Sequence, residues 1–187
     1  MPIHDSPPRY TFVAQLLHWV IAGLVVTQFA LGWTAVDLPV GMHKLTVLAR
    51  HKSFGMTVLM LAILRLFWRL ANPPPPLPDG MTAFERRAAR ATHVAFYVLL
   101  FTMPVTGWLM SSAKKFSVSW FGVFTWPDLI AKNETAFEWL KTIHDGLSDA
   151  LLVIVALHVL AALKHHFWTK DDVLLRMLPF TRQGRRS

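Results

Sequence analysis

The sequence predicts an all-α protein, an integral membrane four-helix bundle with both termini cytoplasmic. Hydrophobic residues make up 53% of its 187 residues, and the mean hydropathy of +0.39 is high for a soluble domain. Because backbone polar groups in lipid must find partners within their own segment, each long apolar run is predicted to be a helix. Short connections would join the helices into a single transmembrane domain over residues 1–187. Four runs, each near the ~20 residues that cross a hydrocarbon layer, lie at about 11–33, 54–71, 93–110 and 146–164.

Polar and proline-rich segments bound the first two runs. Residues 1–10 are polar, include His4 and lack the basic stretch of a signal peptide, so we expect the first run to remain as a membrane anchor. A connection at about 34–50 precedes the second run. That run should end before Pro73, because the four prolines that begin there cannot continue a helix.

The last two runs are flanked by basic and aromatic residues. The basic stretch up to Arg90 is predicted to be an interfacial helical lead-in to the third run, which contains Pro104. The longest connection, 111–143, precedes the fourth run. In the basic tail that follows, His165 and His166 are expected to be anchors at the membrane interface.

The formal net charge of +8 reflects membrane topology better than nucleic-acid binding, because the positive residues lie mainly beside the apolar runs. Lys and Arg in the N-terminal lead, the 72–92 connection and the tail outnumber those in the other two connections. By the positive-inside rule, both termini are expected to be cytoplasmic.

Histidines within membrane segments are uncommon, and each one either has a function or forms a hydrogen bond between helices. His144 and His158 stand fourteen residues apart in the fourth run, which is nearly four helical turns and about 21 Å along one face. His18 should lie at the depth of His158, and His51 at the depth of His144. The sequence therefore predicts two cross-helix pairs, one toward each side of the bilayer.

Two imidazoles per layer restrict the chemistry. The absence of cysteine excludes thiolate metal sites, iron–sulfur clusters and covalent c-type haem, and without an acidic cluster a zinc or di-iron site is not expected. The pairs suit an iron whose other four ligands come from a porphyrin. Such an iron has no open position and should transfer electrons. Small residues that could leave room for a flat macrocycle are Ala22, Gly23, Gly55, Gly146, Ala161 and Ala162.

Other polar residues carry two interpretations each. Arg65, fourteen residues after His51, could pair with a haem propionate or extend toward the interface as a topology signal. His93 could handle a proton at a quinone site or form an interhelical hydrogen bond. Asp145 and Asp149 could orient His144 or simply mark a hydrated helix start. Basic residues that could attract a small anion, or be ordinary loop charges, are Lys44, Arg50, Lys52, Lys114 and Lys115.

The chain resembles the prokaryotic cytochrome b561 family over nearly its whole length. The matching residues are His18-Trp19, His51 with Gly55, His93, Leu140-Lys-x-x-His144, Leu157-His158, and the stretch from His165 to Met177. The resemblance implies a diheme b cytochrome of the bacterial inner membrane, with non-covalent haem b bound by His18, His51, His144 and His158. It further implies electron exchange with ubiquinone and, for one branch, oxidation of superoxide at the periplasmic face.

Three functions remain open at this point. The first is a superoxide:ubiquinone oxidoreductase, with superoxide or another periplasmic donor as the source of electrons. The second is a membrane-anchor subunit that relays electrons for a partner dehydrogenase or hydrogenase. The third is a membrane scaffold without redox activity.

Overall fold

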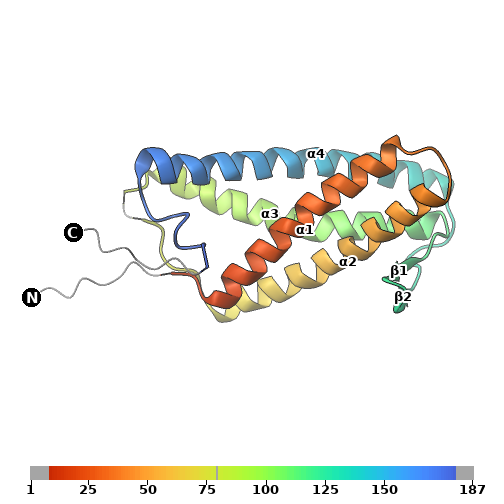
Figure 1. Cartoon of the computed structure of the whole chain (residues 1–187), viewed down its shortest axis with the longest axis horizontal. Helices are drawn as coiled ribbons and strands as arrows, with labels where there is room; N and C mark the ends of the chain where they lie inside the picture. Colours follow the sequence, from red (N-terminus) through yellow and green to blue (C-terminus); the bar gives the residue numbers. More distant parts are fainter. Residues whose placement is uncertain (1–8, 79, 180–187) are drawn as a thin grey trace, which may run out of the picture.

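The computed structural model describes residues 9–78 and 80–179, which form four long helices and one short hairpin (Figure 1). The predicted helical membrane bundle is confirmed, since all four helices are long and apolar enough to cross a membrane. His4 and the rest of residues 1–8, with residues 180–187, lie outside the described residues. The elements are α1 (Phe12–Asp37), α2 (Met42–Ala71), α3 (Ala83–Ala113), β1 (Val118–Trp120), β2 (Phe124–Trp126) and α4 (Glu134–Lys164).

The helices extend beyond the apolar runs, so several predicted ends were wrong. α2 begins within the predicted 34–50 connection, and the first turns of α4 lie within the predicted 111–143 connection. The predicted helical lead-in before Arg90 is confirmed as the first turns of α3. Capping side chains fix where α3 and α4 start. The Thr82 hydroxyl accepts from the Glu85 amide while the Glu85 carboxylate accepts from the Thr82 amide, and Asn133 caps α4 in a similar way. The end of α2 before the prolines is confirmed.

Consecutive helices pack side by side, whereas the fourth stands apart from the first two. α1 packs on α2, α2 on α3 and α3 on α4. Within the described helices, no Cα of α4 lies within 8 Å of a Cα of α1 or α2. Contact between α4 and the α1–α2 pair is therefore made by side chains. The buried apolar cluster between the helices consists of Ile21, Val25, Val58, Ala62, Leu99, Leu100 and Leu151.

The β1–β2 hairpin closes one end of the bundle, called here the hairpin end (Figure 1). The Ser53 hydroxyl donates to the Ser119 carbonyl and accepts from the Phe121 amide. The Trp120 indole donates to the Thr57 hydroxyl at 3.0 Å. These contacts fix the hairpin to the part of α2 that carries His51.

The opposite end, where α1 begins and α4 ends, is called the tail end (Figure 1). There residues 171–178, the C-terminal strap, lie against α1. The Gln15 amide donates to the Arg176 carbonyl, and the Trp19 indole donates to the Met177 carbonyl, each at 2.9 Å. The strap therefore contacts the residue next to His18.

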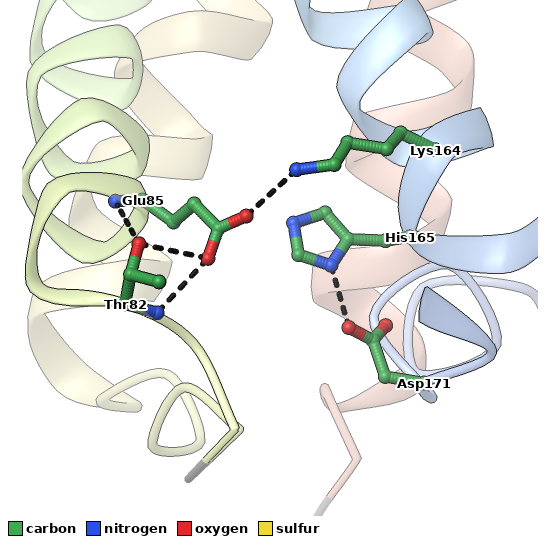
Figure 2. A network of polar contacts seen from close by, with 5 residues as sticks. All are labelled: Thr82, Glu85, Lys164, His165 and Asp171. Carbon is green, nitrogen blue, oxygen red and sulfur yellow. Dashed lines mark hydrogen bonds and ion pairs between the residues drawn. The ribbon is translucent and has the colours of Figure 1, made fainter. Parts of the chain in front are cut away.

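A π-helical turn, His165–Thr169, leads from α4 into the strap. The prediction that His165 is an interface anchor was wrong, because only 6% of it is exposed. Its Nδ1 lies 2.5 Å from the Asp171 carboxylate, beside an ion pair between Lys164 and Glu85 (Figure 2). The turn ends at Lys170, which takes a left-handed conformation (φ 55°) and whose amide donates to the His165 carbonyl.

Candidate functional site

The tail-end pair consists of His18 on α1 and His158 on α4. Their ring centroids are 6.1 Å apart, and the ring planes meet at 69°. His93 on α3 also lies close, with its ring centroid 6.3 Å from that of His158. Three helices thus bring imidazoles together at this level of the bundle.

The hairpin-end pair consists of His51 on α2 and His144 on α4. Their ring centroids are 6.4 Å apart, and the ring planes meet at 72°. Both histidine pairs are thus brought together as the depth argument predicts. Each bridges helices whose backbones do not approach each other.

The geometry and the set of donors fit a porphyrin-bound metal. A metal–imidazole bond is about 2 Å long and the nitrogen lies about 1 Å from the ring centre, so two imidazoles facing each other across one metal have centroids about 6 Å apart. In the described part of the chain, no group of three or more His, Cys, Asp or Glu side chains is placed to hold a metal ion. The spacing of the His18–His158 pair and of the His51–His144 pair therefore fits one metal at each level, whose other four ligands a macrocycle would supply.

Glycines allow the hairpin-end rings to lie against neighbouring helices. A Cβ at Gly32 would lie 3.6 Å from Cε1 of His51, and a Cβ at Gly107 would lie 3.3 Å from Cε1 of His144. Gly23 and Gly146, which were predicted to leave room for a macrocycle, border open space, since a Cβ at either would have no described atom within 4 Å. Gly55 does serve close packing, because a Cβ there would lie 2.9 Å from Nε2 of Gln28.

Thr106, which was not predicted from the sequence, contacts Nδ1 of His144. The Thr106 hydroxyl lies 2.9 Å from His144 Nδ1. Asp145, one of the predicted orienting residues, instead pairs with Lys141 at 2.9 Å. No sequence signal marks Thr106, since its contact depends on how α3 and α4 are rotated about their axes.

Arg65 lies near the tail-end histidines. Its guanidinium donates to the Ala14 carbonyl at 3.2 Å. The positive charge of Arg65 is close enough to interact electrostatically with His18, His93 and His158. A narrow pocket beside it is lined by Tyr10, Ala14, Arg65, Trp68, Arg69, Asn72, Pro74 and Tyr97. A cation in this position can interact with a carboxylate or with developing negative charge.

Two of the five basic residues predicted to attract an anion form ion pairs at the hairpin end. Lys114 forms an ion pair with Glu134, and Lys115 forms one with Asp128. Lys52 differs, since its ammonium donates to the Phe116 carbonyl at 3.1 Å and its charge acts on His51. Lys52 is therefore held by a backbone carbonyl and not by a carboxylate.

Comparison with known proteins identifies relatives along nearly the whole chain. The family described as prokaryotic cytochrome b561 matches residues 9–180. "Cytochrome b561 homolog 2" of Escherichia coli (strain K12) is 38% identical over 182 residues, covering 95% of each chain. "Probable superoxide oxidase CybB" of Yersinia pestis is 27% identical over 174 residues, covering 91% of this chain and 96% of that protein. "Cytochrome b561 homolog 1" of Escherichia coli (strain K12) is 26% identical over 176 residues, covering 91% and 97%.

Proposed function

Because the chain belongs to the prokaryotic cytochrome b561 family of haem-binding, electron-transferring membrane proteins, we propose that it carries single electrons across a membrane through two b-type haems. We assign His18 and His158 to one haem and His51 and His144 to the other. The observation that carries the proposal is the presence of two imidazole pairs, each with centroids about 6 Å apart, between helices with separated backbones. Haem b, when bound, supplies a one-electron iron couple that two axial histidines leave without an open position.

We place the tail end in the cytoplasm and the hairpin end in the periplasm of a bacterial inner membrane. The positive-inside rule supports this orientation, because the connections and termini at the tail end carry more Lys and Arg. His158 and His144 on α4 would then lie toward the inner and outer faces respectively.

Superoxide is the proposed electron donor, and it would react at the hairpin end. Two superoxide anions would each lose one electron and become oxygen, while ubiquinone would take up two electrons and two protons and become ubiquinol. The name of the Yersinia pestis relative, "Probable superoxide oxidase CybB", supports this choice. Lys52 supports it as well, since a half-buried cation beside His51 would attract a small anion.

We propose the tail end for the exchange with ubiquinone. His93 is within ring contact of His158 and can pass a proton, whereas Arg65 can pair with a haem propionate. The buried Tyr97 hydroxyl beside Arg65 supports a polar partner here, because it has no hydrogen-bond partner among the described residues; the pocket that it lines, about 20 Å³, has room for about one water molecule. An unpaired buried hydroxyl gains free energy when a ligand carbonyl accepts its hydrogen bond.

The test uses the purified protein alone, with a superoxide source and a water-soluble ubiquinone analogue. We expect superoxide to produce the visible bands of reduced b-type haem, and the quinone to reoxidise the haem and become quinol. If superoxide leaves the haem oxidised until a partner dehydrogenase or hydrogenase is added, the chain is an electron-relaying anchor subunit. A reduced-minus-oxidised spectrum without b-type bands would contradict both functions and favour a scaffold.

A further inference from the structure

The two hairpin-end histidines differ in what holds their second ring nitrogen. His144 Nδ1 lies 2.9 Å from the Thr106 hydroxyl. The Nδ1 of His51 is buried and has no hydrogen-bond partner in the described residues. The ring of His144 is therefore the one whose orientation a polar side chain fixes.

The Thr106 hydroxyl makes two contacts, and together they determine which atom carries each hydrogen. It lies 2.9 Å from the Met103 carbonyl as well as 2.9 Å from His144 Nδ1. A carbonyl oxygen can only accept, so the single hydroxyl hydrogen is donated to Met103. The hydroxyl oxygen must then accept from His144, which places the imidazole hydrogen on Nδ1.

A neutral imidazole with its hydrogen on Nδ1 has a free lone pair on Nε2. That nitrogen is the one able to ligate a metal, and the hydrogen bond from Nδ1 makes it a stronger donor. Gly107, in the next position of α3, allows the ring this close to the helix. One turn of α3 therefore sets both the position and the tautomer of His144.

We propose that Thr106 is a positioning residue for the hairpin-end haem, which selects the Nε2-ligating tautomer of His144 and tunes the reduction potential. The proposal rests on the assignment of His51 and His144 to one haem. A stronger imidazole donor favours the oxidised iron, so Thr106 would lower the potential of this haem relative to a variant without the hydroxyl. The His51 ring has no side-chain partner at Nδ1 in the described residues, and the polar group that interacts with it is the Gln28 backbone.

The test compares three single variants in the full-length, haem-loaded protein. Thr106→Val keeps the shape and removes the hydroxyl, whereas Thr106→Ser keeps the hydroxyl. Thr102→Val is the matched control, because Thr102 lies one turn earlier on α3 and donates to its own helix, at the Val98 carbonyl. The readouts are a spectroscopic redox titration and the rate at which haem passes to an excess of a haem-binding acceptor protein.

In Thr106→Val we expect one of the two redox components to move to a more positive potential. We also expect one haem per chain to be lost roughly 10- to 100-fold more readily, the usual effect of removing the partner of a ligating histidine. Thr106→Ser and Thr102→Val should match the wild type in both measurements.

Two results would overturn the proposal. In the first, Thr106→Val would match Thr102→Val in both potential and haem transfer. In the second, Thr106→Ser would behave like Thr106→Val, which would make the methyl group and not the hydroxyl responsible. If Thr106→Val does not fold, the Thr106→Ser comparison still decides between hydroxyl and methyl. A wild-type protein that binds no b-type haem would contradict the proposed function itself, whereas two haems with an unshifted Thr106→Val would contradict only this inference.

Discussion

At the scale of single residues, the hairpin-end histidine rings lie against two glycines, Gly32 and Gly107, and only Gly107 is predicted to be needed. Both glycines lie inside helices, where glycine is unfavourable relative to alanine by about 1 kcal/mol. This cost is offset only where the absence of a side chain lets a neighbouring group pack closer to the helix. The contact at Gly107 is the tighter one. A Cβ at Gly107 would lie 3.3 Å from Cε1 of His144, whereas a Cβ at Gly32 would lie 3.6 Å from Cε1 of His51.

The glycine contacts predict opposite results for two alanine substitutions. Gly107→Ala should displace the His144 ring by a few tenths of an ångström and weaken haem retention about tenfold, a typical effect of disturbing a ligating histidine. Gly32→Ala should leave haem retention unchanged, because its Cβ would make an ordinary van der Waals contact. The haem-to-protein ratio after gel filtration checks both variants. Equal retention in the two would show that the closer approach at Gly107 has no role.

At the scale of elements, the end of α4 connects the tail-end histidines to the C-terminal strap. The π-helical turn buries His165, whose Nδ1 meets Asp171, and Asp171 in turn accepts from the Val173 amide at 3.1 Å. The strap then bonds to Gln15 and Trp19, on either side of His18 in the sequence. The strap lies beside the start of α1 (Figure 1), and Asp171 links its first residues to His165.

Removing the Asp171 carboxylate should release the strap. We expect Asp171→Ala to cost about 1–3 kcal/mol locally, because it leaves a buried imidazole nitrogen without its partner. Trypsin should then cleave after Lys170 or Arg176 several-fold faster than in the wild type, since cleavage follows the population of the open form. Asp172→Ala is the control, because that side chain is exposed. Equal cleavage rates in the two variants would show that the His165–Asp171 contact does not hold the strap.

The helices themselves could be predicted from the sequence, because apolar length and the need to satisfy backbone groups in lipid leave few alternatives. Their starts were harder to predict. Hydropathy marks only the segment of a helix that lies in the hydrocarbon layer. The helices α3 and α4 begin earlier, where Thr82 and Asn133 cap their first turns. The T-x-x-E pattern at Thr82 is a sequence signal for a helix start, and it agrees with the helical lead-in predicted up to Arg90.

At the scale of the whole molecule, the levels of the histidines could be predicted because the rise per residue of a helix is fixed. His18 meets His158 and His51 meets His144, as the depth comparison requires. The partners around each ring could not be predicted. Thr106 and Gly107 contact His144 from another helix, and their placement depends on how α3 and α4 rotate and pack, which one sequence does not specify.

The separation of α4 from α1 and α2 is the property of the whole bundle that the proposed function needs. Helices that pack closely everywhere leave no space for a macrocycle, whereas here the imidazole pairs bridge the gap at two levels. Two redox centres at different depths would let electrons cross a membrane without a mobile carrier. The pairing of histidines across this gap is therefore the central claim.

The most direct test replaces each of His18, His158, His51 and His144 by alanine and measures the haem-to-protein ratio with the redox spectrum. We expect each variant to retain about one haem per chain. His18→Ala and His158→Ala should keep the same spectral and redox component, and His51→Ala and His144→Ala should keep the other. If His158→Ala and His51→Ala lost the same component, or if all four variants kept both haems, the proposed pairing would be contradicted.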